Sequence, residues 1–118
     1  MAGSGRLTTH VLDTMHGKPA RGMRIELHYV HDDHTHHITD GYTNADGRVD
    51  APLLTPEQFE KGEYEIRFHV GQYYERLGTE IETPFLNVVP IRFQISEDSH
   101  YHVPLLVSPV AYSTYRGS

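Results

Sequence analysis

Residues 63–70, with the sequence EYEIRFHV, alternate between polar and apolar side chains along their whole length. The same alternation occurs in residues 23–29, MRIELHY, and in residues 91–95, IRFQI. Successive side chains of an extended strand point to opposite faces, so a period of two gathers the apolar residues on one face. Each of the three segments therefore predicts a half-buried β-strand whose other face is wet.

The segments around these strands carry turn and helix signals. Residues 36–43 are β-branched and aromatic enough to predict a further strand that pairs with residues 23–30. Residues 44–47, NADG, predict a turn, because Asn and Asp tolerate the left-handed region and Gly adopts a positive φ without strain. Residues 71–78 predict the single helix, of two turns at most, and residues 79–89 predict a loop.

Seven or eight short strands separated by turns predict an all-β chain that folds as a two-sheet antiparallel β-sandwich. Its core consists of the apolar side chains that the alternation places on the inner faces. These are Val11, Ile25, Leu27, Tyr64, Ile66, Phe68, Ile91, Phe93, Ile95, Val103 and Leu105.

The length and charge of the chain limit its class. The 118 residues predict one domain, residues 1–118, with a frayed or disordered N-terminus over residues 1–6. The chain has no cysteine, so disulfides and thiolate metal ligands are excluded. Its formal net charge of −6 argues against a nucleic-acid partner, which requires a concentrated basic surface. No secretory signal or membrane-spanning stretch is evident, so we expect a cytoplasmic protein with no membrane partner.

Two strands lack a simple wet face. In residues 7–13 and 100–107, the side chains opposite the predicted core mix histidine with apolar residues. An ordinary solvent face would carry Lys, Glu or Thr there, so this pattern indicates a surface covered by another subunit or a ligand pocket. Edge-strand histidines beside scattered surface apolar groups are the alternative. The side chains in question are His10, Leu12, His100, His102, Pro104 and Leu106.

Five motifs resemble one family over nearly the whole chain. Residues 9–13, THVLD, and 17–20, GKPA, resemble the opening of the transthyretin-like family, and residues 46–48, DGR, resemble its middle motif. Residues 100–106, HYHVPLL, and 112–118, YSTYRGS, resemble its close. The resemblance implies a transthyretin-like (prealbumin-like) sandwich of about eight strands with one short helix. It also implies a homotetramer with clefts at the dimer–dimer interface.

The family has two branches, one that carries thyroid hormone and one that hydrolyses 5-hydroxyisourate in urate degradation. The resemblance implies that the hydrolase branch is marked by histidines on the first and penultimate strands, an arginine after the middle Asp-Gly, and a Tyr-Arg-Gly-Ser tail. This sequence carries these marks at His10, His102, Arg48 and residues 115–118. The implied activity is hydrolytic ring opening at the N1–C6 amide, with 5-hydroxyisourate as the small-molecule substrate and no cofactor.

The chemistry of such a reaction suits these residue types. A histidine near its ordinary pKa can remove a proton from water, and a permanently charged guanidinium can stabilise the developing oxyanion. We expect His10 and His102 to flank the water, with His10 preferred as the base and the other histidine orienting water or protonating the leaving nitrogen. Arg48 polarises the substrate. The expected substrate-binding residues are Tyr115, Arg116, Gly117 and Ser118.

Two other functions compete with this one. A non-enzymatic carrier would use the same fold and interface channel, although two histidines and an arginine facing one cavity do not suit a hydrophobic carrier. Residues 31–37, HDDHTHH, offer enough imidazoles and carboxylates for a metal site. This segment is predicted to form a hairpin tip, where polar residues are expected, so we favour a solvated loop and predict no metal site.

Overall fold

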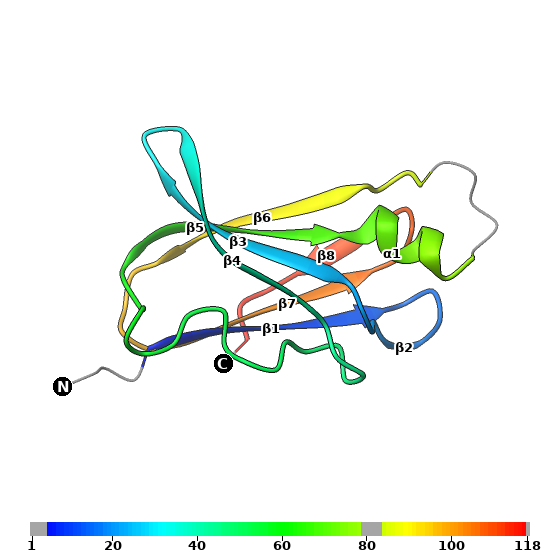
Figure 1. The fold of residues 1–118 in the computed structure, drawn as a ribbon, viewed down its shortest axis with the longest axis horizontal. Helices are drawn as coiled ribbons and strands as arrows, with labels where there is room; N and C mark the ends of the chain where they lie inside the picture. The colour runs from blue at the N-terminus through cyan, green and yellow to red at the C-terminus, as the bar shows by residue number, and fades with distance from the viewer. Residues whose placement is uncertain (1–4, 79–83, 118) are drawn as a thin grey trace.

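The structure, a computed structural model, describes residues 5–78 and 84–117. Within these ranges the chain forms eight strands and one short helix (Figure 1), as the sequence predicts. No helix in the described ranges is long and apolar enough to cross a membrane. The elements are β1 (Arg6–Asp13), β2 (Lys18–Pro19), β3 (Arg24–His31), β4 (His34–Tyr42), β5 (Gly62–His69), α1 (Val70–Arg76), β6 (Val88–Ile95), β7 (His100–Val107) and β8 (Tyr112–Thr114).

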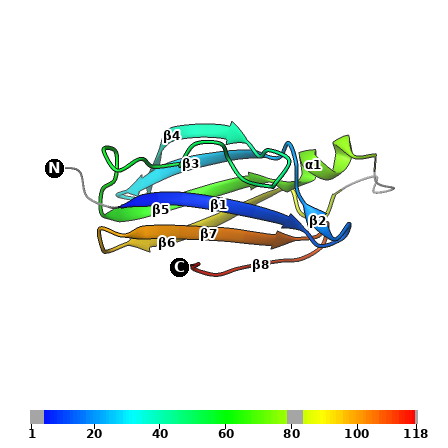
Figure 2. The same ribbon diagram turned by 90° about the horizontal axis from the view of Figure 1, so that it is seen from below.

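The strands form two four-stranded sheets, one in the order β2-β1-β7-β8 and the other in the order β4-β3-β5-β6. The predicted sandwich is confirmed, and all pairings are antiparallel except that of β1 with β7, which is parallel. Figure 2 shows β1 and β8 on opposite sides of β7. Alternation along a strand is the same for either pairing direction, so the sequence pattern could not reveal the parallel pair.

The predicted boundaries differ most at β6. This strand begins at Val88, so the loop predicted over residues 79–89 is wrong for Val88 and Val89; residues 79–83 lie outside the described residues. Pro90 is tolerated within β6 because β6 is an edge strand, where one side of the backbone forms no ladder. The predicted helix of residues 71–78 is observed as α1, with slightly earlier ends.

The N-terminus is ordered further out than we expected. Arg6 begins β1 and pairs with His100, and the backbone N–H of buried Gly5 donates to the Asp98 carboxylate at 2.8 Å. Fraying over residues 1–6 is therefore not observed at Gly5 and Arg6, because strand pairing and this hydrogen bond hold them. Residues 1–4 lie outside the described residues.

The predicted core is confirmed for all but two of its side chains. Ile91 and Phe93 point inward from β6 but are only half-buried. A hollow of about 260 Å³ separates this edge from Tyr115 and Arg116, and it leaves one side of both side chains open. Strand β8 has only three residues, and neither β8 nor the tail after it fills the space opposite β6. The fully buried core side chains include Leu7, Val11, Ile25, Leu27, Ile66, Phe68 and Leu105.

A buried carboxylate joins the end of β1 to α1. The Asp13 side chain is fully buried and accepts hydrogen bonds from the hydroxyls of Tyr73 and Tyr74, each at 2.8 Å. It also accepts from the backbone and ring nitrogens of His16. Burial acts to raise the pKa of Asp13, but the hydrogen bonds from His16, Tyr74 and Tyr73 outweigh it and hold the pKa below its usual value. This anchor fixes the strand that carries His10.

Candidate active site

The parallel pairing of β1 with β7 brings the two predicted histidine strands side by side. In this register Thr8 pairs with His102 and His10 pairs with Pro104, so all four belong to one face of the sheet. His10 and His102 are half-buried within the single chain. Pro104 differs from our expectation, because it is buried; it lies between β1 and β8, whose Thr114 hydroxyl donates to its carbonyl at 2.7 Å.

The two imidazoles that we predicted to be catalytic lie close together. The ring centroids of His10 and His102 are 6.5 Å apart. Nε2 of His10 lies 2.8 Å from the backbone carbonyl oxygen of Asp46. A carbonyl can only accept, so Nε2 of neutral His10 must carry the hydrogen, and Nδ1 keeps its lone pair. In this tautomer Nδ1 of His10 can act as a base.

The predicted turn at residues 44–47 carries Arg48 to the same place. Gly47 has a φ of +78°, and a Cβ at this position would lie 2.4 Å from the carbonyl oxygen of Val11, so only glycine allows the close approach. The Val11 N–H donates to the Gly47 carbonyl at 2.8 Å, and a bridge pairs Arg48 with His10. The loop thus forms an edge beside β1 and presents an exposed arginine next to His10.

These elements surround a hollow of about 380 Å³, which we call the histidine hollow. Burial lowers the pKa of His102, and the positive charge of Arg48 and the imidazoles of His100 and His10 lower it further. His102 is therefore neutral near pH ~7 and can donate or accept a proton. The residues that line the histidine hollow are Thr8, Thr9, Arg48, Val49, His100 and His102.

Thr8 is a residue of this site that the sequence reasoning missed. Its hydroxyl oxygen lies 2.7 Å from Nε2 of His100 and 2.9 Å from Nδ1 of His102. The signal was present in the alternation, because Thr8 lies two residues before His10 and so shares its face of β1. Its contact with His102 depends on the register of β1 and β7, which the sequence pattern does not contain.

The predicted C-terminal tail divides between two places. The Gly117 N–H donates to the carbonyl of His102 at 2.7 Å, so the tail runs beside the histidine hollow. The guanidinium of Arg116 lies 4.0 Å from the centre of the Tyr101 ring, and its NH2 group donates to Ser99 at 3.2 Å. Arg116 and Tyr115 line the 260 Å³ hollow beside β6, so this single chain does not bring them to the histidine pair. Ser118 lies outside the described residues.

The histidine-rich segment of residues 31–37 is only partly the hairpin tip that we predicted. The tip consists of Asp32 and Asp33, with φ values of 50° and 62°, whereas His34, His36 and His37 lie in β4. Both positive φ values match a two-residue hairpin turn. Across residues 5–78 and 84–117, no three His, Cys, Asp or Glu side chains are arranged to hold a metal ion.

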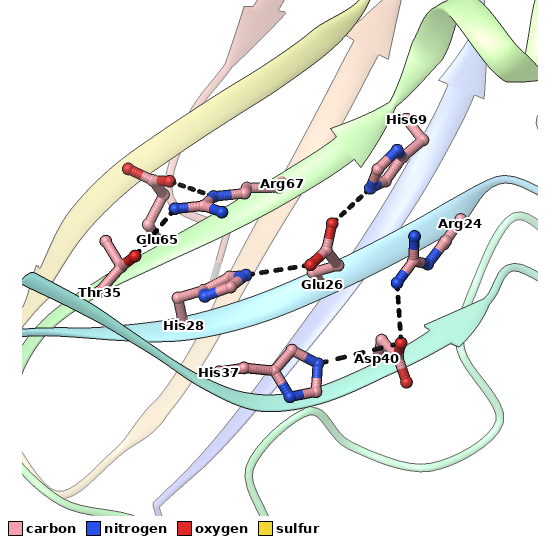
Figure 3. Close-up of polar contacts among 9 residues, drawn as sticks. All are labelled: Arg24, Glu26, His28, Thr35, His37, Asp40, Glu65, Arg67 and His69. Atoms are coloured by element: carbon pink, nitrogen blue, oxygen red, sulfur yellow. Dashed lines mark hydrogen bonds and ion pairs between the residues drawn. The ribbon is translucent and has the colours of Figure 1, made fainter.

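A second polar cluster covers the outer face of the other sheet (Figure 3). Nε2 of His69 lies 2.5 Å from one carboxylate oxygen of Glu26, and Nε2 of His28 lies 3.1 Å from the other. Arg24 of β3 donates to Asp40 of the neighbouring strand β4 at 3.2 Å. The hydrogen bond from His69 lowers the pKa of Glu26. Burial acts to raise this pKa, but the hydrogen bond from His28 lowers it further, and the result is a pKa of about 2.

Further along the same face, Glu65 accepts from Arg67 at 2.6 Å and from Arg92 at 3.1 Å, and Arg67 also donates to Thr35 at 3.1 Å. These cross-strand pairs join β4, β3, β5 and β6. Nδ1 of His28 is buried without a hydrogen-bond partner. The cluster stabilises the outer face of this sheet and lies on a different sheet from the histidine hollow.

Similar proteins share both the sequence and the fold. Residues 7–117 match the HIUase/Transthyretin family. The chain is 54% identical over 120 residues to 5-hydroxyisourate hydrolase 2 of Rhizobium meliloti, with 100% of each protein covered. A crystal structure of (S)-allantoin synthase matches with a TM-score of 0.90 and 45% identity, over 100% of this chain but 46% of that one. The structure of Klebsiella pneumoniae 5-hydroxyisourate hydrolase matches with a TM-score of 0.82 and 32% identity, over 97% of this chain and 99% of that one.

Proposed function

The chain belongs to the HIUase/transthyretin family, and from this premise we propose that it is a 5-hydroxyisourate hydrolase of urate degradation. The observation that carries the proposal is that His10, His102 and Arg48 meet beside one hollow, in a chain 54% identical along its whole length to a hydrolase of that name. The reaction is hydrolysis of the N1–C6 amide, which opens the ring to 2-oxo-4-hydroxy-4-carboxy-5-ureidoimidazoline.

In the proposed mechanism, His10 activates the water. Its hydrogen bond to the Asp46 carbonyl leaves Nδ1 as an acceptor, which takes a proton from water as the oxygen attacks the amide carbon. General base catalysis of this kind contributes about 10²–10⁴ in rate. The water proton passes to Nδ1 of His10, and the new C–O bond places negative charge on the former carbonyl oxygen.

Arg48 and His102 complete the mechanism. The exposed guanidinium of Arg48 stabilises the oxyanion, so this chemistry requires no metal ion. As the C–N bond breaks, the leaving nitrogen needs a proton, and His102 is the second imidazole of the site. We assign substrate binding to the tail, residues 115–118; Gly117 lies against His102, and Tyr115 and Arg116 lie further along the same chain end.

A carrier that uses the same fold is the competing function. A carrier of an apolar ligand would bury apolar surface, whereas five of the six side chains that line the histidine hollow are polar and Val49 is the sixth; the polar ones are Thr8, Thr9, Arg48, His100 and His102. In one chain the 260 Å³ hollow beside β6, lined in part by Ile91, Phe93 and Val103, is the more apolar of the two. Binding without turnover would therefore point to that second hollow.

The absorbance of freshly prepared 5-hydroxyisourate distinguishes the two functions. We expect the protein to accelerate its decay, and we expect His10→Asn and His102→Asn each to lower kcat by about 10²-fold or more. His36→Asn is the matched control, because His36 is exposed on β4. Decay at the uncatalysed rate with the wild-type protein, or full activity in both site variants, would contradict the proposal.

We include a homotetramer with sites at the dimer–dimer interface in this proposal. Leu12 and Leu106 lie on the histidine face and are half-buried in a single chain. Apolar side chains beside half-buried histidines suit a face that another subunit covers. Light scattering after size-exclusion chromatography should give the mass of four chains, and the mass of one chain would reject the assembly.

We also place the protein in the cytoplasm. The sequence has no cysteine, which suits a reducing compartment. Fractionation of the native host, with immunodetection in the soluble cytoplasmic fraction, would test this location. Recovery in a periplasmic or secreted fraction would contradict it.

A further inference from the structure

Thr8 lies between two histidines and contacts both. Its hydroxyl oxygen is 2.7 Å from Nε2 of His100 and 2.9 Å from Nδ1 of His102. Both distances are those of hydrogen bonds. The arrangement follows from the fold, because Thr8 pairs with His102 across the parallel ladder while His100 and His102, two residues apart, share a face of β7. The centroids of these two rings are 6.2 Å apart, so the hydroxyl bridges them.

A hydroxyl has one hydrogen, and this restricts how the three groups can bond. Thr8 can donate to at most one imidazole, and its two lone pairs can accept from one imidazole or from both. If it accepts from Nε2 of His100 and donates to Nδ1 of His102, neutral His102 carries its hydrogen on Nε2. If Thr8 instead accepts from Nδ1 of His102, either alone or together with Nε2 of His100, His102 carries its hydrogen on Nδ1, and its Nε2 is a bare acceptor.

The fixed tautomer of His10 decides which direction serves the reaction. His10 already supplies an acceptor, because its Nε2 must donate to the Asp46 carbonyl. Amide hydrolysis requires a proton acceptor for the water and a proton donor for the departing nitrogen, and in the proposed mechanism, with His10 as the acceptor, a bare Nε2 on His102 could not be that donor. We propose that His100 and Thr8 are positioning residues that hold His102 as the proton donor, with His100 donating to Thr8 and Thr8 donating to Nδ1 of His102.

The transfer balances without a further reactant. As His102 gives its Nε2 hydrogen to the leaving nitrogen, the Thr8 hydroxyl hydrogen moves to Nδ1 of His102. The Nε2 hydrogen of His100 moves to the Thr8 oxygen, and Nδ1 of His100 takes up a proton from water. Water then returns a proton to Nε2 of His102, the same transfers run backward, and Nδ1 of His100 releases its proton to solvent, which restores the starting tautomers. The proton that His10 removed from the attacking water also returns to solvent, so the number of protons on the protein is unchanged. The role and the choice of direction both rest on the proposed hydrolase function, whereas the direction of the hydrogen bonds can be measured without turnover.

Nearby charges keep the relay in the neutral forms that it requires. Burial and the charge of Arg6 lower the pKa of His100, and burial followed by Arg48, His100 and His10 lowers that of His102. Two positively charged imidazoles would have no acceptor nitrogen, so the Thr8 hydroxyl could only accept from them and could not donate to Nδ1 of His102. When both rings are neutral, each has one acceptor nitrogen, so the Thr8 hydroxyl can donate to one ring and accept from the other.

Kinetics of Thr8 variants test the relay. Thr8→Val keeps the shape of the side chain but removes the hydroxyl, and we expect kcat to fall by about 10- to 100-fold with little change in KM. Thr8→Ser keeps the hydroxyl, and we expect it to restore kcat to within about threefold of the wild type. An unchanged kcat in Thr8→Val, or a loss in Thr8→Ser as large as that in Thr8→Val, would overturn the proposal.

Imidazole ¹⁵N NMR tests the hydrogen-bond direction without any substrate. In the histidine-labelled wild-type protein we expect His102 to carry its hydrogen on Nε2 and to accept at Nδ1, and we expect this preference to weaken in Thr8→Val. Hydrogen on Nδ1 of His102 in the wild type would refute the assignment. Because this readout is independent of turnover, a wild-type protein without activity would reject the proposed function and leave the direction of the relay to be decided by NMR alone.

Discussion

Substitution of Gly117 by alanine tests whether the tail positions His102. A Cβ at Gly117 would lie 2.7 Å from Cδ2 of His102 and 3.2 Å from its Cβ and Cγ. An ordinary contact begins at 3.4 Å, so the tail or the ring must move by about 0.7 Å. The ring is held by Thr8 through Nδ1, and the tail is held by the Gly117 N–H to the His102 carbonyl. Either movement therefore disturbs the site.

The expected magnitude follows from this displacement. A misplacement of about 1 Å can cost about 10²-fold in rate, so we expect kcat/KM to fall by about 10- to 100-fold in Gly117→Ala. This corresponds to about 1.4–2.7 kcal/mol of transition-state stabilisation. The free energy of unfolding should change by less than about 1 kcal/mol, because the tail contributes one backbone hydrogen bond here.

The assay follows the absorbance of 5-hydroxyisourate, with urea unfolding measured at the same protein concentration. Gly41→Ala is the matched control, because its Cβ would meet Val49 at 3.4 Å, an ordinary contact, and both its activity and its stability should be close to the wild type. A Gly117→Ala protein with wild-type kcat/KM and unchanged His102 NMR signals would refute the reasoning.

Three further predictions concern charge. Asp13→Asn should lower the free energy of unfolding by about 2–4 kcal/mol in urea titration, because buried tyrosine hydroxyls lose their anionic acceptor; a loss below about 0.5 kcal/mol would contradict this. The pKa of Glu26 is lowered to about 2, so its stabilisation is complete above its unfolded value of 4.5 and is lost as the pH falls toward 2. Glu26→Gln should remove up to about 3 kcal/mol of that acid-dependent stability, and parallel stability–pH curves for the two proteins would count against it. Arg48→Met removes a cation that lowers the pKa of His102, so NMR titration should show that pKa rising, whereas Arg21→Met should leave it unchanged.

Local sequence was sufficient for the strands and most of the core. The period of two in residues 63–70 reflects which side chains face inward within one strand, and β5 buries Tyr64, Ile66 and Phe68 as that period predicts. The turn at residues 44–47 could also be predicted from local sequence, because glycine readily adopts a positive φ such as that of Gly47. The end-to-end motifs also sufficed to identify the family, which matches residues 7–117.

Tertiary structure alone decided how the candidate site is assembled. Thr8 and His102 are 94 positions apart, and only the parallel pairing and register of β1 with β7 place their side chains in contact. The alternation that makes each strand is unchanged by a different pairing direction, so no pattern within a strand contains this information. The same holds for Gly117, which meets His102 because the chain folds back beyond β8. The residue types within one strand determine which of its side chains face the core. The distances between side chains of different strands depend on how the strands pair and pack in the whole sandwich.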